Sequence, residues 1–478
     1  MSYESVIGLE VHVQLNTNTK IFCSCPLTFG EQPNIAVCPI CLGHPGTLPV
    51  LNKMALHKAI LAGLTLHSKV NLFSQFDRKN YFYPDLPKGY QITQNDFPIV
   101  TGGMVSIHLG DGTQKDIRVH HMHLEEDAGK LTHSEHEDFS RVDLNRAGTP
   151  LLEIVSEPDM RTSEEAYYYL RELRTMMRYI NVSDVNLEEG SLRCDANISI
   201  RKVGAPLGTR VEVKNLNSFN GVRKAIDYEI ERQIALVESS GTVEQETRLF
   251  DANKNITIGM RFKSEAADYR YFPDPDLPPV RITEDLIKEL ESQLPEHPYA
   301  KRMRYHTTLS LPLKDCIVLT DDQEVAIYFE AILEHTTQDV KKVLNWVLTE
   351  VMSRMNEHKL TATEFAQKVS PQHTGELLSL VKDGTISGKI AKDIFDDMVL
   401  TSKSPIILVE EKGLKQVSNA GELEAIIDKI LADNPGQVEQ FKSGKDKLFG
   451  FFVGQLMKAT NGQANPELSN TILKEKLK

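Results

Sequence analysis

The sequence predicts an α+β protein in which a β-rich N-terminal part precedes helical parts. Short segments of alternating apolar and polar residues, separated by Gly and Pro, fill roughly the first 290 residues. This pattern is typical of antiparallel sheets that have one buried face and one solvent-exposed face. Residues 272–279 are rich in proline, which removes backbone donors and excludes a helix or a central strand there. Beyond about residue 290 the apolar residues recur at helical spacing.

A chain of 478 residues is too long for one hydrophobic core. We expect a β-rich domain over 1–292, a helical domain over 293–405 and a small helical tail over 406–478. The composition, 40% hydrophobic and 25% charged, is typical of a globular protein. The net charge of -13 argues against a surface that binds nucleic acid non-specifically, although lysines outnumber acidic residues in 441–478. No apolar run approaches the roughly 20 residues that span a bilayer, so no membrane association is expected.

The first predicted strand covers residues 8–15, with apolar residues at its odd-numbered positions and Glu10, His12 and Gln14 on the other face. Further strands gather polar side chains in the same way: His121, His123 and Glu125 in 118–127; Arg193, Asp195, Asn197 and Ser199 in 191–200; Glu212 and Lys214 in 210–214. Strands of this type predict an antiparallel sheet with one functional face.

Two helices are predicted within the β-rich part. Thr162-Ser-Glu-Glu165 has the pattern of a capping box, and apolar residues follow it at helical spacing. A second helix is expected over 219–238, with Asn217 and Ser218 at its N-cap and Gly241 as its stop.

Four cysteines form two short pairs, Cys23-Ser-Cys25 and Cys38-Pro-Ile-Cys41. Paired thiols on two tight turns are typical of a tetrahedral zinc site, although four thiols that merely lie near one another would look the same in the sequence. Because every ligand position is a thiol, no place remains for water, and the zinc would be structural. Such clustered cysteines favour reduced thiols in the cytosol over disulfides.

A second metal site is predicted on the wet face of the sheet, with four candidate ligands: Glu10, His12, Glu125 and Asp195. Each alone can be an ordinary solvated side chain, or a histidine bonded to a carbonyl. Acids on three separate strands nevertheless indicate a site, and oxygen ligands with at most one imidazole suit Mg²⁺ and phosphoryl chemistry. The neighbouring Glu126 and Asp127 are interpreted as outer-shell or surface groups.

Residues 77–90 are rich in tyrosine and phenylalanine, with Lys79 and Lys88 among them. The segment can be an ordinary loop. Alternatively, its aromatic rings can stack on a nucleotide base while a lysine ammonium group contacts a phosphate, and this pattern would fit ATP and RNA equally well. Lys214 and Asn215 lead into the N-terminus of helix 219–238. This segment can bind an anion of a cofactor, or it can be an ordinary N-cap. The sequence contains no P-loop, so any use of ATP proceeds without one.

Together these motifs resemble the family of B subunits of the aspartyl/glutamyl-tRNA amidotransferase. The stretches that carry the resemblance follow one another along the whole chain: residues 7–15, 37–43, 78–85, 124–130, 145–153, 190–197, 213–219, 268–273 and 462–466. So many motifs in one order argue against a chance similarity.

The resemblance implies a cradle-like antiparallel β domain with the zinc clip, a helical domain, and a tail like the small YqeY family that reaches tRNA. It also implies a cytoplasmic heterotrimer with an amidase-like A subunit, which releases ammonia from glutamine, and a small C subunit. The B subunit would bind misacylated Glu-tRNA(Gln), Asp-tRNA(Asn) or both. It would phosphorylate the side-chain carboxyl with ATP and amidate it with channelled ammonia, as a ligase that forms a C–N bond.

By the same resemblance, Mg²⁺ on the four predicted ligands would bring carboxylate and triphosphate together. Lys79 would contact phosphate, and Lys88 would lie near Glu125 and gate the entry of ammonia. The alternative is a non-catalytic, zinc-stapled scaffold that presents tRNA to a partner enzyme. The related archaeal E subunit would carry an inserted synthetase-like domain, for which this chain has no room. The choice between the two misacylated tRNAs stays open.

Overall fold

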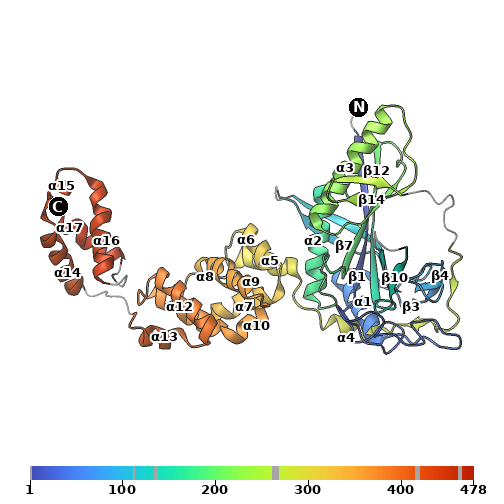
Figure 1. Ribbon diagram of the computed structural model, residues 1–478, viewed down its shortest axis with the longest axis horizontal. Coiled ribbons are helices and arrows are strands. Elements are labelled where there is room, and N and C mark those ends of the chain that lie inside the picture. The colour runs from blue at the N-terminus through green and yellow to red at the C-terminus, as the bar shows by residue number, and fades with distance from the viewer. Residues whose placement is uncertain are drawn as a thin grey trace. The chain divides into compact units, whose positions relative to one another are not determined.

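The computed structural model describes residues 3–110, 113–133, 138–260, 269–414, 420–460, 464 and 466–477 (Figure 1). Residue 268 and most of 462–466, which contribute to the resemblance, lie outside the described residues. The chain forms two compact units, Met1–Pro298 and Tyr299–Lys478. The described part of the first unit contains a large sheet and that of the second is helical, so the predicted α+β class is confirmed.

Among the described residues, ten strands form the main sheet of the first unit. The order is β15-β14-β13-β12-β1-β11-β8-β6-β2, and β7 also pairs with β8. Neighbouring strands are antiparallel except β13 and β14, which are parallel. The strands of this sheet are β1 (Tyr3–Gln14), β2 (Lys69–Val70), β6 (Val100–Thr101), β7 (Met104–His108), β8 (Gln114–Glu126), β11 (Pro150–Ser156), β12 (Leu192–Lys202), β13 (Val211–Lys214), β14 (Thr247–Asp251) and β15 (Ile256–Gly259).

The other strands form small sheets: β3 (Phe73–Ser74) with β17 (Val280–Arg281), β4 (Asp77–Asn80) with β5 (Tyr90–Thr93) and β16 (Phe272–Pro273), and β9 (Lys130–His133) with β10 (Ser140–Asp143). The aromatic-rich segment thus begins and ends in the paired strands β4 and β5. Side chains fasten this pair to the main sheet, because Gln91 Nε2 donates to the carbonyl of Glu126 at 2.8 Å and Thr93 Oγ1 donates to Glu125 Oε2 at 3.3 Å.

Helices α1 (Lys53–Thr65), α2 (Ser163–Tyr179) and α3 (Phe219–Glu238) pack on the apolar side of the main sheet, and α4 (Glu284–Glu291) packs against α1 (Figure 1). Leu9, Val11 and Val13 of β1 are buried in the same core as Leu170 of α2 and Val222 of α3. Burying each such side chain stabilises the fold by about 1.5–3 kcal/mol. Because strand side chains alternate between faces, the intervening side chains of β1 lie on the side away from this core.

The caps of the two predicted helices explain where each begins. Thr162 Oγ1 accepts a bond from the amide of Glu165 at 3.1 Å, as predicted, but the carboxylate of Glu165 accepts from Arg161 N and Lys115. Half of the predicted capping box therefore forms, because nearby donors engage the glutamate. Helix α3 begins at the predicted residue, with Ser218 Oγ accepting from the Gly221 amide at 3.0 Å.

In the second unit, one apolar core joins α5 (Pro298–Thr308), α6 (Leu313–Leu319), α7 (Gln323–Glu334), α8 (Val340–Trp346), the π-helical turn η1 (Val347–Val351), α9 (Met352–His358), α10 (Ala362–Lys368), α11 (Pro371–Lys382), α12 (Gly388–Thr401) and α13 (Pro405–Glu411). A separate core joins α14 (Ala420–Asp433), α15 (Pro435–Lys442), the 3₁₀ turn η2 (Asp446–Leu448), α16 (Phe449–Ala459) and α17 (Pro466–Lys476). The domain limits at 292 and 405 stay predictions. None of the helices in the described ranges is long and apolar enough to cross a membrane.

Candidate functional site

The polar face of the main sheet collects functional side chains from five neighbouring strands. The register pairs Glu10 with Asp195 and His12 with Arg193 across β1 and β12, and His12 with Glu153 across β1 and β11. Glu153 in turn pairs with His123 of β8. Residues that are paired directly across strands project from the same face, so these side chains meet on one surface.

The first acidic group joins His12, Glu125 and Glu153. His12 Nε2 lies 3.2 Å from Glu153 Oε2 and 3.7 Å from Glu125 Oε1. One ligand atom from each of the three residues lies within 4.8 Å of the others, a spacing that can hold a metal ion. One imidazole with two carboxylates is a donor set that suits a divalent cation with a preference for oxygen.

His123 also contacts this group. Its Nε2 lies 3.3 Å from Glu153 Oε2 and 3.6 Å from Glu125 Oε2, and its ring stacks on that of His121. Burial lowers the pKa of His123, but the negative charge of Glu153 and the bonds to both carboxylates outweigh burial and raise it to about 10. Burial raises the pKa of Glu153, but the two imidazoles hold it well below its usual range. Both carboxylates are therefore held in place by positive neighbours.

A second acidic group joins Glu10, Asp195 and Glu212. Lys214 Nζ lies 2.6 Å from Asp195 Oδ2 and 2.9 Å from Glu212 Oε1, and Asn197 Nδ2 donates to Glu10 Oε1 at 2.8 Å. Burial, followed by the charge of Glu153, raises the pKa of Glu10. An ammonium group thus neutralises the second group, whereas the first is balanced by the imidazoles of His12 and His123 and has no lysine or arginine bonded to it among the described residues.

The four predicted magnesium ligands divide between these two groups. His12 and Glu125 belong with Glu153, while Glu10 and Asp195 belong with Glu212. The division follows from the sheet, because the acid opposite Glu10 is Asp195 on β12, whereas the acid opposite His12 is Glu153 on β11. Three residues of the site were not among the predicted ligands: Glu153, Glu212 and His123. Glu153 was detectable as the one acid in strand β11, with apolar residues on both sides of it in 151–155.

Lys79 of β4 is a cation without an ion-pair partner among the described residues. Its Nζ lies 4.8 Å from the centroid of the Tyr269 ring, and no hydrogen-bond acceptor contacts it among the described residues. Burial lowers the pKa of Lys79, but the charge of Glu125, together with Tyr271, Tyr269 and Glu153, outweighs burial and raises it. A buried, charged ammonium group on aromatic rings can receive an anionic ligand.

Lys88, expected near Glu125, forms its carboxylate contact with the adjacent Glu126. Adjacent residues of a strand project from opposite faces, so Glu126 points away from the first acidic group. Its Oε1 also accepts from the amide of Ile92 at 2.8 Å, and both Glu126 and Asp127 are buried rather than at the surface. Lys88 lines a pocket of about 210 Å³ together with Arg78, Tyr90 and the loop after Cys38.

Asn215, predicted to bind a cofactor anion with Lys214, acts in the structure as a brace. Its φ is +67°, and its Nδ2 donates to the carbonyl of Phe250 at 3.0 Å. Lys214 is held in the ion pairs of the second acidic group. Neither side chain is therefore free for a ligand in this arrangement.

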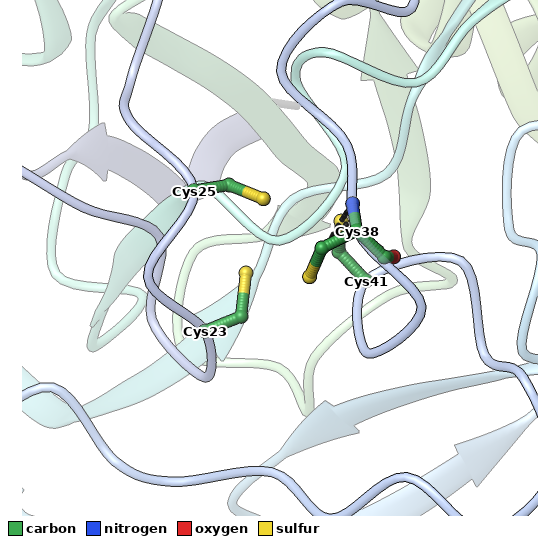
Figure 2. Close-up of side chains that lie close together, drawn as sticks. All are labelled: Cys23, Cys25, Cys38 and Cys41. Carbon is green, nitrogen blue, oxygen red and sulfur yellow. Dashed lines mark hydrogen bonds between the residues drawn. The ribbon is translucent and has the colours of Figure 1, made fainter.

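The four predicted cysteines converge from two loops (Figure 2). The sulfur atoms of Cys23, Cys25, Cys38 and Cys41 all lie within 4.8 Å of one another, and none of these cysteines forms a disulfide. A hydrogen bond from the Cys23 thiol lowers the pKa of Cys41 to about 4, and the positive charge of Lys20 contributes to this lowering. This arrangement can hold a metal ion, and four sulfur ligands fit tetrahedral zinc.

Lys20 gives independent support for charge in this cluster. It is fully buried, and its Nζ lies 3.7 Å from Cys41 Sγ and 3.2 Å from the carbonyl of Leu144. No carboxylate contacts it among the described residues. A buried ammonium group requires a negative partner, so the thiolates are its counter-charge.

Comparisons with known proteins match both units of the chain. Residues 5–288 match the GatB/GatE catalytic domain, and residues 327–477 match the GatB domain related to YqeY. A protein of Geotalea daltonii is 56% identical over 481 residues, and one of Persephonella marina is 53% identical over 479 residues; each alignment covers 100% of both chains. A protein of Brachyspira hyodysenteriae is 53% identical over 99% of both chains. All three are named as B subunits of the aspartyl/glutamyl-tRNA(Asn/Gln) amidotransferase.

Proposed function

This chain belongs to the family of aspartyl/glutamyl-tRNA(Asn/Gln) amidotransferase B subunits, and from that membership we propose how its site works in the ATP-dependent amidation of misacylated tRNA. It is the component that binds Glu-tRNA(Gln), Asp-tRNA(Asn) or both and activates the side-chain carboxyl. The match to a catalytic domain favours this reaction over the non-catalytic scaffold.

Amidation of a free carboxylate needs activation, because a carboxylate is a poor electrophile. A carboxylate oxygen attacks the γ-phosphorus of ATP, the bond to the bridging oxygen breaks, and ADP leaves. Ammonia then attacks the carbonyl carbon of the acyl phosphate, phosphate leaves with the bonding electrons, and the nitrogen loses a proton to give the amide. Each step gathers negative charge that cations must offset.

The first acidic group carries this proposal. His12, Glu125 and Glu153 present an imidazole nitrogen and carboxylate oxygens at a common point on the polar face of the sheet. Bound there, Mg²⁺ would supply the positive charge that draws triphosphate and carboxylate together. Lys214 already neutralises the group of Glu10, Asp195 and Glu212, so that group would gain a metal only by displacing the ammonium.

Lys79 is the proposed contact for the transferred phosphoryl group. It is charged, lies among tyrosine rings and interacts electrostatically with both Glu125 and Glu153. An ammonium group acts as a point charge and suits phosphate without a fixed bonding geometry. Aromatic rings beside it are suited to the base of the nucleotide.

The remaining assignments concern the structural metal and the partners. We assign zinc to the four cysteines as a structural ion that fixes the loop beside Lys88. The contact between Lys88 and Glu126 is a gate for ammonia supplied by an amidase-like A subunit, with a small C subunit completing the trimer. The lysine-rich tail contacts tRNA phosphates.

Replacing Glu125 by Gln tests the proposal in the purified trimer. We expect unchanged binding of misacylated tRNA together with loss of the ATP-dependent acyl phosphate, because the amide removes one charged ligand and keeps the shape. Glu164→Gln, a change in the first turn of α2, is the control and should leave both measurements as in the unaltered protein. Undiminished amidation by the Glu125 variant would support the scaffold instead.

A further inference from the structure

Arg193 lies next to the first acidic group but has no place in the site described so far. It stands on β12 directly opposite His12 of β1, so the two side chains project from the same face. The guanidinium group therefore lies beside the first acidic group on the polar face of the sheet.

The bonding of Arg193 leaves most of its donors unused. Nη2 donates to Asp127 Oδ2 at 2.8 Å, and Nε, which is itself buried, makes no hydrogen bond within the described part of the chain. Asp127 is buried and also accepts from Gln14 Nε2 at 2.9 Å, so it is a fixed anchor. The Arg193 side chain is still 36% exposed. Since a guanidinium group has five N–H donors, this anchored group retains donors for a ligand.

Arg146 also contacts Asp127 but makes more hydrogen bonds than Arg193 does. It also lies against Asp127, at 3.5 Å, and its side chain is 37% exposed. Unlike Arg193, it donates to the carbonyls of Ala128 at 3.0 Å and Gly129 at 2.6 Å. Arg146 therefore braces the backbone, and the two arginines form a matched pair.

We propose that Arg193 binds the side-chain carboxylate of the aminoacyl group on tRNA and holds it beside His12 for phosphorylation. This inference rests on the proposed function and adds the residue that recognises the acyl group. Asp127 is the positioning residue that fixes the direction of the guanidinium fork.

Electrostatics explains why the site needs such a residue. The face carries Glu10, Glu125, Glu153 and Asp195, and it repels an incoming carboxylate unless a cation offsets that charge. A guanidinium group matches the planar carboxylate with two parallel hydrogen bonds, whereas an ammonium group does not. Lys79, which has no such planar fork, is left for the phosphoryl group.

The test compares Arg193→Met with Arg146→Met in the purified trimer. We measure the KM for the misacylated tRNA that the unaltered trimer amidates, the inhibition constant of the same tRNA without its amino acid, and the KM for ATP. Loss of a charged hydrogen-bonded contact predicts a rise of about tenfold or more in the KM for misacylated tRNA in the Arg193 variant. The other two constants should stay as in the unaltered trimer, and Arg146→Met should change none of the three.

Arg193→Lys keeps the positive charge but lacks the planar guanidinium group, and it serves as a second variant if Arg193→Met fails to fold. It should show a smaller rise in the KM for misacylated tRNA. A rise of the inhibition constant alongside the KM would assign Arg193 to the tRNA body, and a rise in the KM for ATP would assign it to the nucleotide. Either result, or no change, overturns the inference. The proposed function fails separately, if the unaltered trimer does not amidate misacylated tRNA.

Discussion

His12 Nε2 lies 3.2 Å from Glu153 Oε2, across the boundary between the first strand of the chain and one that begins at residue 150. The contact joins two sequence segments that share no local signal. It exists because β11 is inserted between β1 and β8 in the main sheet. The candidate metal group is therefore a product of strand order.

Glu153 should matter more to activity than Glu212. Glu153→Gln removes a charged ligand from the group without a lysine, so we expect amidation to fall by about 100-fold or more and Mg²⁺ to bind more weakly. Glu212→Gln removes a partner of Lys214, and we expect less than about tenfold loss, because Asp195 still holds the ammonium group. Titrating the activity of each variant with Mg²⁺ checks the ranking. Equal losses would mean that the two acidic groups act as one site.

Lys20 should control how firmly the cysteine cluster retains zinc. In Lys20→Met a similar volume remains, but the buried counter-charge of the thiolates is lost. Outer-shell changes of this kind typically weaken metal binding by about 10–100-fold. Elemental analysis should give about one zinc per unaltered chain, as expected for one tetrahedral four-thiol site, and competition with a chelator should strip the variant faster. Lys58→Met is the control, because Lys58 bonds Asn16 and Asn181 and touches no cysteine. Equal rates for both variants would contradict a role for Lys20.

Glu350 should make the helical core of the second unit sensitive to acid. Burial raises its pKa, but Lys392 and Arg354 together hold it below the usual value of 4.5. A carboxyl whose pKa is lowered by folding stabilises the protein above its unfolded pKa, and this contribution is lost as the pH falls through the folded value. Glu350→Gln should therefore cost about 1.5 kcal/mol at pH 7 and less at about pH 3.

The single tryptophan provides the measurement. Trp346 ends the helix before η1, and its ring centroid lies 5.4 Å from that of Phe395. Unfolding in urea, followed by Trp346 fluorescence, thus reports on this core. Glu357→Gln, an exposed change in α9, is the control. A cost for Glu350→Gln that did not shrink between neutral and acidic pH would show that the ion pairs contribute nothing there.

Local patterns predicted much of this structure because their causes are local. Alternation along β1 identified the face that carries Glu10 and His12, and Ser218 marked the start of α3. The pairing of thiols predicted the convergence of Cys23 and Cys41. Each depends on backbone geometry over a few residues.

What was missed depends on contacts between distant segments. Glu153 stood out in the sequence as the one acid of its strand, but its partners could not be assigned before the order of β1, β11 and β8 was known. The resemblance predicted that Lys88 lies near Glu125. The side chains of Glu125 and Glu126 point to opposite sides of the strand, and only the position of β5 shows that Lys88 contacts Glu126. Strand order also divides Glu10 from His12, since the acid opposite Glu10 lies on β12 and the acid opposite His12 lies on β11.

Gly43 should link the cysteine loop to the proposed ammonia gate. Its φ is +71°, and a Cβ added there would lie 2.6 Å from Lys88 Cγ. Gly43→Ala must therefore displace Lys88, whose ammonium group contacts Glu126, in addition to the strain of a left-handed backbone. Gly46→Ala is the matched control, since Gly46 has a φ of +83° but open space around its Cβ position. Both changes should cost about 1 kcal/mol of stability through backbone strain.

The decisive measurement is the ratio of amidation rates with glutamine and with added ammonium. If the contact between Lys88 and Glu126 gates ammonia delivered by the partner, Gly43→Ala should lower the glutamine-dependent rate more than the ammonium-dependent rate. Gly46→Ala should leave the ratio as in the unaltered trimer, because its strain does not reach Lys88. Equal ratios in the two variants would separate Lys88 from ammonia entry and leave it as a structural partner of Glu126.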